Sequence, residues 1–308
     1  MHLGTPGKIG YAMFSTALLF AAASPGSVSA QDLEARTYQN APVGFNFLLV
    51  GYAFSHGNIL VDPALPVEEG TANLHTIVPR YVRTLSLGGL SAKLNAWIPF
   101  TTGDFEGIVQ GEQAMTSRSN FGDPRFELSV ALLGAPALAA QDFRTYRQRT
   151  VLGASVQVTA PLGEYDSTKL VNLGSNRWSF RPQVGVSHAL GPLVLDAYGS
   201  VWLFGDNPDS GGQTLAQSAI YVLQANISYT IRPGAWVAVQ GGYAEGGRTT
   251  VGGVRRGDLQ QNTRLGLTAS LPLAPRHGLK LLLATGIATR IGADFNSFGV
   301  AYQYTWGR

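Results

Sequence analysis

The residues best suited to covalent chemistry in this sequence are Ser187 and His188, which are adjacent. A serine hydroxyl activated by an imidazole is the nucleophile of many hydrolases, and some twelve-stranded membrane barrels are lipid hydrolases of this kind. His188, however, falls on the apolar face of a strand pattern and lies just before a turn. Neither G-x-S-x-G nor H-E-x-x-H occurs. We therefore predict that the protein is not an enzyme and has no catalytic residues.

Metal and cofactor chemistry find little support in the sequence. The chain has no cysteine, which excludes disulfides, thiolate metal sites and cysteine nucleophiles. The glycine-rich stretch 241–253 lacks the strand–turn–helix pattern that cradles a phosphate. We therefore predict no metal site and no cofactor.

Another set of polar residues recurs at alternate positions of strand-like segments and forms the candidate lining of a pore. Its members are Lys93, Asn95, Arg125, Glu127, Gln157, Arg181, Gln183, Asp196, Gln224, Asn226, Arg264 and Lys280, with Arg290 as a further candidate. Buried charges need partners, so these residues either pair into a network that fills a narrow lumen or line a narrow water-filled path. Basic residues outnumber acidic ones in the set, so a pore would favour anionic or polar aromatic solutes such as phenolates.

Strands of alternating polarity would position this set. In PRFELSVALL, residues 124–133, apolar side chains alternate with Arg125, Glu127 and Ser129. Successive side chains of a strand point to opposite faces, so one face is apolar and the other polar. A soluble sheet with one wet face and a membrane barrel with one face in lipid both produce this pattern.

The composition favours the membrane barrel. Charged residues make up 13% of the chain, whereas an ordinary soluble domain has about 25%. After the first thirty positions no apolar run approaches the roughly 18 residues of a helical span. The formal net charge of +3 is close to neutral for 308 residues, so the sequence does not indicate nucleic-acid binding.

About twelve strands of membrane-crossing length follow one another. We expect them over residues 44–55, 73–85, 91–100, 124–133, 150–160, 177–186, 193–204, 221–230, 235–243, 264–271, 279–290 and 295–306. Short and long connections largely alternate, which is typical of barrels with tight periplasmic turns and long external loops. We expect a long polar loop at 101–121, whereas 134–149 is too long for a turn and could be a short helix or an extended strand. The fold class predicted is an all-β, antiparallel, up-and-down barrel.

The first thirty residues are expected to be a cleaved signal peptide. Lys8 supplies the positive charge, residues 13–23 the apolar core, and Val28-Ser29-Ala30 the small residues before the cleavage site. Residues 31–308 then form a single barrel domain. Within it, 31–43 is polar with a few apolar positions and is interpreted as a periplasmic lead-in that is too short for an N-terminal plug.

Four stretches resemble a known family. They are TYQNAPVGFNFLLVGYAFSHG, GDPRFELSVALLGAPAL, QVTAPLGEYDSTKLVNLGSNRWSFRPQVGVSHALG and GGRTTVGGVRRGDLQQNTRLGLTASLPL. Together they are similar to the outer-membrane transporter family labelled MetA-pathway of phenol degradation, and the likeness spans about residues 36–307. The resemblance implies an outer-membrane barrel, and the family label implies passage of aromatic compounds.

These observations lead to one main hypothesis of function and two alternatives. The main one is an outer-membrane channel or facilitator for passive uptake of small solutes, including aromatic, phenol-like ones. The first alternative is a non-conducting structural barrel with a charge-plugged lumen, and the second is a lipid-modifying barrel enzyme. The partners expected are the outer-membrane lipid, the small solute and the barrel-assembly machinery, with no nucleic acid.

Overall fold

The computed structural model describes residues 33–59, 67–169, 171–290 and 294–307. The expected signal peptide, residues 1–30, lies outside the described residues. The strands that form the wall are β1 (Phe45–Asn58), β2 (Val67–Leu87), β3 (Leu90–Trp97), β6 (Arg125–Leu133), β7 (Thr150–Thr159), β8 (Ser179–Leu190), β9 (Leu193–Phe204), β12 (Ile220–Arg232), β13 (Ala235–Gly246), β16 (Gln260–Ala274), β17 (His277–Thr289) and β18 (Asp294–Gly307). These twelve match the twelve strands expected from the alternation.

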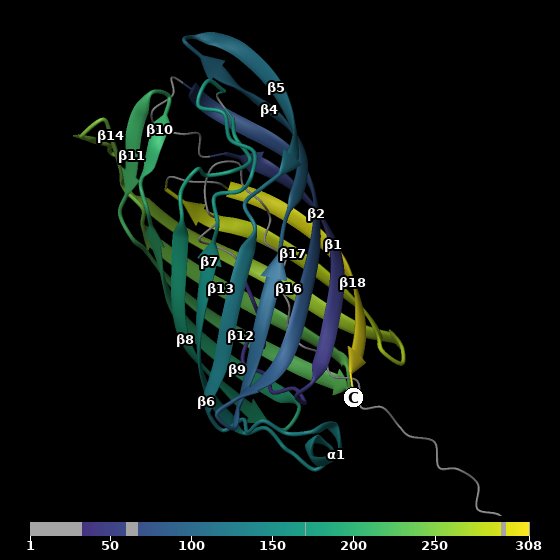
Figure 1. Ribbon diagram of the computed structural model, residues 1–308. Helices are drawn as coiled ribbons and strands as arrows, with labels where there is room; N and C mark the ends of the chain where they lie inside the picture. The colour runs from purple at the N-terminus through teal and green to yellow at the C-terminus, as the bar shows by residue number, and fades with distance from the viewer. Residues whose placement is uncertain (1–32, 60–66, 170, 291–293, 308) are drawn as a thin grey trace, which may run out of the picture.

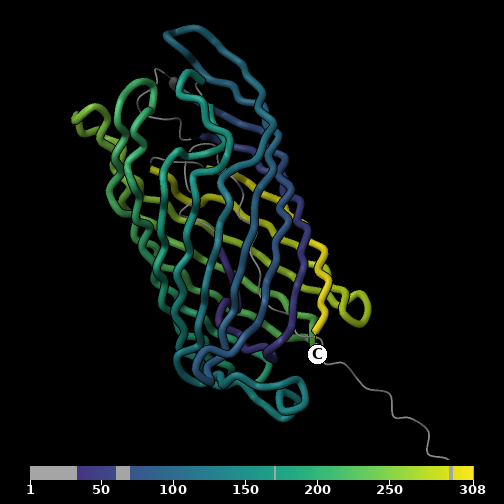
Figure 2. Tube along the Cα trace, in the orientation of Figure 1, coloured from purple at the N-terminus to yellow at the C-terminus, as the bar shows by residue number. Residues whose placement is uncertain are grey.

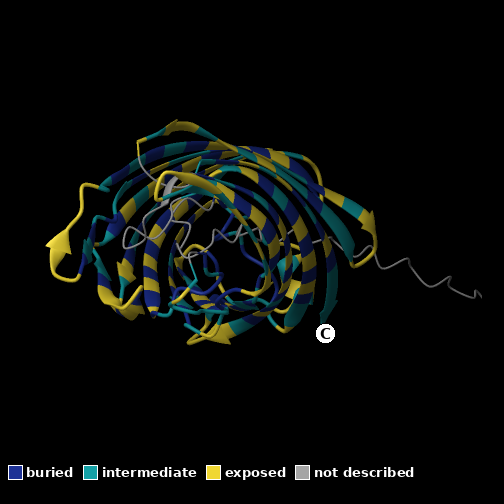
Figure 3. Cartoon of the chain, turned by 90° about the horizontal axis from the view of Figure 1, so that it is seen from above, coloured by how far each residue is buried: buried dark blue, intermediate teal, exposed yellow. Residues whose placement is uncertain are grey.

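The twelve strands form a closed antiparallel ring. Each pairs with its neighbours in chain order, and β1 closes the ring by pairing with β2 on one side and β18 on the other. The closing register runs from Phe45 opposite Gly307 to Asn58 opposite Asp294. Seen from above, the strands are arranged as a ring (Figure 3). The expectation of an all-β, antiparallel barrel is confirmed.

The two faces of the wall differ as the sequence pattern predicts. On β6, Phe126 and Leu128 are exposed on the outside, whereas Arg125, Glu127 and Ser129 are buried on the inside. The same alternation of exposed apolar and buried polar residues recurs on β7, β8 and β9. An apolar outer belt around a polar interior is the arrangement that a membrane requires of a barrel. Within the described ranges, no helix has both the length and the apolar character of a membrane span.

The two ends of the barrel carry different connections (Figure 1). Short turns lie at one end, between β2 and β3, β8 and β9, β12 and β13, and β16 and β17. The connections at the other end are longer and include β4 (Phe100–Val109), β5 (Glu112–Phe121) and a small separate sheet of β10 (Asn207–Ser210), β11 (Gln213–Gln217), β14 (Thr249–Val251) and β15 (Val254–Arg255). The end with the short turns corresponds to the periplasmic side of bacterial barrels.

Two connections differ from the sequence expectation. Residues 101–121, expected to be a loop, form the β4–β5 hairpin, which pairs with the start of β2 and extends the wall beyond the ring (Figure 1). Its outward positions are polar because they lie past the lipid belt, so the alternation that marks the other strands is missing. Residues 134–149 contain the short helix α1 (Ala140–Phe143) at the periplasmic end.

The lipid-facing assignment of the outer wall predicts a strong effect of an added charge. Val184 is 61% exposed near the middle of β8, so Val184→Arg should destabilise the protein in bilayers by about 2–4 kcal/mol. Urea unfolding of the wild type and the variant in lipid vesicles measures this difference in the free energy of unfolding. Gln113→Arg adds the same charge at an exposed position of β5 and should leave the stability near that of the wild type. Equal stability of the two variants would mean that the outer belt does not contact lipid.

Candidate functional site

All twelve candidate lining residues lie in the barrel interior. Each is at most 8% exposed, and each alternates with an exposed or half-buried neighbour on its strand. Arg290 does not belong to this set, because it is exposed at the end of β17 and its guanidinium donates to Gln261 Oε1 over 3.3 Å. The interior polar set is therefore the candidate functional site, with Arg290 removed.

Part of the interior set forms a hydrogen-bonded chain across neighbouring strands. Arg80 donates to Asn95 Oδ1 over 3.1 Å, and Asn95 donates to Glu127 Oε1 over 3.1 Å. The guanidinium of Arg181 lies 3.7 Å from Glu127 Oε2. Glu127 and Arg181 thus offset one another, as the sequence analysis considered. Arg80 was missed by the sequence analysis, although its alternation with outward residues on β2 is the signal that places it inside.

The lumen also contains a segment that the sequence analysis placed elsewhere. Residues 33–44, here called the N-terminal segment, are almost entirely buried and run inside the ring of strands (Figure 2). The interpretation of this stretch as a periplasmic lead-in too short for a plug is wrong. The stretch has no strand periodicity, and nothing in its composition distinguishes a loop in water from a loop held by a polar lumen.

Hydrogen bonds from the wall hold the backbone of the N-terminal segment. Gln224 Nε2 and Asn226 Nδ2 both donate to the carbonyl of Glu34, over 2.8 and 3.0 Å. Lys93 Nζ donates to the carbonyl of Thr37 over 3.1 Å. Asp196 Oδ2 also accepts from the backbone N–H of residue 36 over 3.0 Å, so four candidate lining residues bind the backbone of this segment. Polar residues that could have lined an open path instead satisfy buried backbone groups.

Glycines in the wall make room for two side chains of the N-terminal segment. A Cβ atom at Gly153 would lie 2.1 Å from the ring of Tyr38, and one at Gly185 would lie 2.8 Å from it. A Cβ atom at Gly242 or Gly266 would lie 2.8 Å from the side chain of Leu33. Cβ atoms in real structures essentially never lie this close to another heavy atom. A side chain at any of these inward glycines would therefore clash with the docked segment.

The connection 134–149 braces the N-terminal segment at the periplasmic end. The backbone N–H of Val43 donates to the carbonyl of Leu138 over 2.9 Å. Asn40 donates from its side chain to the carbonyl of Pro136 over 3.1 Å, and from its backbone to Gln148 Oε1 over 2.9 Å. This connection, whose role the sequence left open, therefore supports the occluding segment and is not itself the plug.

A second connection folds inward at the external end. Asp123 accepts hydrogen bonds from the backbone N–H groups of Gly163 and Ser175, both over 2.9 Å. These bonds hold the β7–β8 connection, whose Val171 and Leu173 pack against an apolar cluster of Leu74, Phe105 and Phe295. The lumen is thus narrowed near both ends.

The buried charges of the described residues are predominantly cationic. Eight cationic side chains are buried: Arg36, Arg80, Lys93, Arg125, Arg177, Arg181, Arg264 and Lys280. Four carboxylates are buried: Glu34, Asp123, Glu127 and Asp196. Several of the cations lie over aromatic rings, such as Arg80 at 4.5 Å from Trp97 and Arg181 at 5.1 Å from Trp202. The interior therefore offers positive charge and hydrogen-bond donors to anything that enters it.

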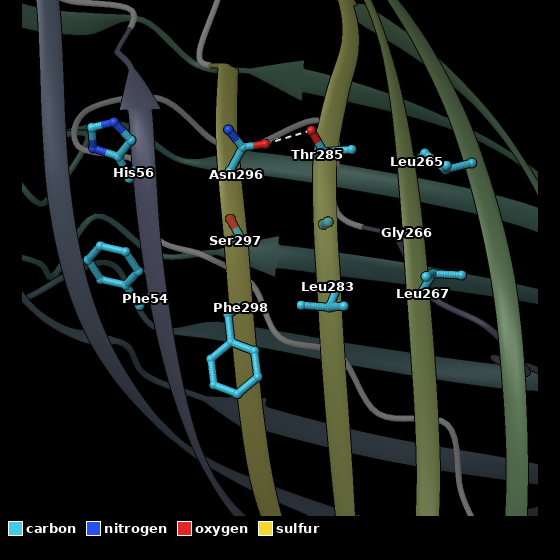
Figure 4. A pocket seen from close by; sticks show the side chains of 11 residues that line it. Phe54, His56, Leu265, Gly266, Leu267, Leu283, Thr285, Asn296, Ser297 and Phe298 are labelled. Atoms are coloured by element: carbon cyan, nitrogen blue, oxygen red, sulfur yellow. Dashed lines mark hydrogen bonds between the residues drawn. The ribbon is translucent and has the colours of Figure 1, made fainter.

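The outer surface carries a groove that is separate from the lumen. It has a volume of about 520 Å³ and crosses β1, β16, β17 and β18, with Phe54, Leu283 and Phe298 among its apolar lining (Figure 4). At its polar end Thr285 donates to Asn296 Oδ1 over 2.6 Å. The pairing of β17 with β18 ends nearby, at Ala284 opposite Ser297. Because its side chains belong to the outward face, this groove opens toward lipid.

The residues considered for hydrolase chemistry are not brought together. Ser187 is fully buried on the inside, whereas His188 is half-buried on the outside, where its Nδ1 lies 2.8 Å from Thr150 Oγ1. Among the described residues, no group of three or more His, Asp or Glu side chains could hold a metal ion.

A closed ring of twelve strands with an apolar outer belt and a polar lumen defines a transmembrane β-barrel of the outer-membrane type. The fold is similar to that of the COG4313 outer membrane channel from Pseudomonas putida F1, with a TM-score of 0.73, 22% identity, and coverage of 87% of this chain and 98% of that chain. It is also similar to the beta domain of the Bordetella autotransporter BrkA, with a TM-score of 0.50, 10% identity, and coverage of 86% and 100%.

Residues 52–304 match the family described as "Putative MetA-pathway of phenol degradation", and the chain belongs to this family. The resemblance expected from the sequence is thereby confirmed. None of the curated proteins compared with the chain matches it.

The buried carboxyl group of Glu34 predicts that docking of the N-terminal segment depends on pH. Burial, followed by the charge of Glu127, raises the pKa of Glu34 from 4.5 to about 7, against the opposing charges of Arg80, Arg181 and Lys93. A segment released into water would regain the ordinary pKa, so the docked state binds the proton more tightly. Docking should be most stable below about pH 4.5 and should weaken as the pH rises through about 7.

Hydrogen exchange of the backbone amides in the N-terminal segment at pH 5 and pH 8.5, corrected for intrinsic exchange, measures this. The wild type should lose protection at the higher pH, and Glu34→Gln should show the same protection at both. Constant protection of the wild type across this range would contradict the prediction.

Proposed function

We propose that the protein is a passive outer-membrane channel for small solutes, including aromatic, phenol-like ones. The observation that carries the proposal is the polar, cation-rich interior of a closed barrel, whose obstructing parts are short segments and not a folded plug domain. Polar and charged lumens serve as solute paths in outer-membrane barrels. The twelve candidate lining residues are proposed to line the route when the N-terminal segment moves.

The aromatic part of the proposal draws support from the family description, which refers to phenol degradation. The preference for oxygen-bearing or anionic aromatics draws support from the excess of buried cations over carboxylates. Such charges would attract a phenolate or the oxygen of a phenol and would disfavour a cationic solute.

A non-conducting structural barrel remains the alternative, and one observation favours it. Gln224, Asn226, Lys93 and Asp196 are engaged by the backbone of the N-terminal segment, so these four side chains already have partners while the segment is docked. A channel requires this segment to leave its site, at least in part. A structural barrel requires it to stay.

The absence of cysteine allows a direct test of segment movement. Ala35 of the N-terminal segment packs in one buried cluster with Trp236 and Ala238 of β13. The double variant Ala35→Cys and Ala238→Cys should form a disulfide that locks the segment in the lumen. Conductance in planar bilayers and phenol flux into liposomes should fall on oxidation and recover on reduction.

The single variant Ala35→Cys is the matched control and should not respond to oxidation or reduction. Equal conductance of the oxidised and reduced double variant, with the disulfide verified by mass, would contradict movement of the segment. A correctly folded wild-type protein with neither conductance nor flux would favour the structural barrel.

A further inference from the structure

Five inward polar atoms on neighbouring strands have no hydrogen-bond partner. They are Gln157 Nε2, Thr159 Oγ1, Ser179 Oγ, Arg181 Nε and Trp202 Nε1. All five side chains are at most 5% exposed. Burial of a donor without a partner costs free energy. Other buried polar atoms of the described residues also lack a partner, such as Trp97 Nε1, Ser228 Oγ and Trp236 Nε1. The five named here are distinguished by lying on three successive strands.

The strand register brings these five residues into one patch, here called the donor patch. Gln157 lies opposite Arg181 and Thr159 lies opposite Ser179 across the β7–β8 pair. On the other side of β8, the guanidinium of Arg181 lies 5.1 Å from the ring of Trp202 on β9. The five groups therefore occupy two adjacent levels of three successive strands and face the same interior.

The donor patch borders an apolar part of the inner wall. Trp202 packs with Ile220 and Ala244, and Phe204 and Val222 pack against the same cluster. The rings of Trp202 and Phe204 are stacked, with an interplanar angle of 8° and centroids 6.3 Å apart. Trp202 belongs to both surfaces, because its ring is part of the apolar cluster and its N–H is part of the donor patch.

The chemistry of the five atoms restricts what can complete them. The amide, guanidinium and indole N–H groups only donate, and the two hydroxyls can donate or accept. The nearby Glu127 carboxylate, 3.7 Å from Arg181, balances the charge of the guanidinium. An uncharged or partly charged oxygen acceptor therefore fits better than a cation, and a flat ring fits the surface of Trp202 and Phe204.

We propose that the donor patch and the adjoining Trp202–Phe204 wall form a binding site for a small aromatic molecule that carries an oxygen substituent. The oxygen accepts from N–H groups of the donor patch, the Trp202 N–H among them, and the ring packs on the apolar cluster. The site rests on the proposed function and adds to it a place where an oxygen-bearing aromatic is distinguished from a plain one.

The test compares 4-fluorophenol with 4-fluorotoluene, which share a ring and differ in the oxygen. Binding of each to the full-length protein in detergent is followed by ¹⁹F NMR, where the protein gives no background. The wild type should bind 4-fluorophenol more tightly. Trp202→Phe keeps an aromatic ring and removes the N–H, so it should weaken 4-fluorophenol binding roughly tenfold and leave 4-fluorotoluene within about twofold.

Trp97→Phe is the matched control, because Trp97 also has a buried, unpartnered N–H but lies on β3, outside the donor patch. It should leave both affinities unchanged. A second variant, Gln157→Met with Ser179→Ala, removes two further groups of the patch and should repeat the selective loss. Resistance of the folded barrel to denaturation in unheated gel samples checks that each variant is folded.

Equal binding of the two probes by the wild type, or unchanged 4-fluorophenol binding in both patch variants, would overturn the site. Binding of neither probe would overturn it as well. The conductance and flux of the wild type then decide separately whether the proposed channel function stands, because a channel can conduct without this site.

Discussion

The whole structure depends on one constraint: every backbone N–H and C=O group in hydrocarbon must have a hydrogen-bond partner, because each unpaired group costs several kcal/mol. The chain satisfies it by closing β1 between β2 and β18. Closure fixes the start of β1, Phe45, at the periplasmic rim, beside the end of β18. The residues that precede Phe45 begin at the opening of the lumen, and Gly44, with φ of 82°, turns the chain from there into the wall.

Closure also creates an interior whose polar side chains are shielded from bulk water, so most of their hydrogen-bond partners must come from the protein. Charged side chains pointing inward need partners, and the wall provides some of them, such as Glu127 for Arg181. The N-terminal segment provides others. Its carbonyls accept from Lys93, Gln224 and Asn226, and its Glu34 brings a carboxyl group near Arg80 and Arg181. The contacts by which the N-terminal segment occludes the lumen are thus the same contacts that give these polar groups their partners.

The sequence predicted the wall because period-two alternation is a direct record of which face meets lipid. All twelve strands and the inward direction of Lys93, Arg125 and Asp196 follow from it. The same signal vanishes where both faces of a strand meet water, so the alternation does not predict the β4–β5 hairpin. It also vanishes in residues 33–44, which have no regular structure. Their position depends on bonds to distant strands and on Gly153 and Gly185, whose lack of side chains is meaningful only once the barrel is closed.

Different parts of β9 contact different parts of the interior, from the periplasmic end to the external end. Asp196 and Tyr198, in the periplasmic half of the strand, hold the N-terminal segment through hydrogen bonds of 3.0 and 3.1 Å. Trp202 and Phe204 lie further along the same strand, toward the end with the long connections. A solute entering from outside would reach the donor patch before it reached the segment. Recognition of an oxygen-bearing ring would therefore precede displacement of the segment, and selection and passage would be separate steps within one lumen.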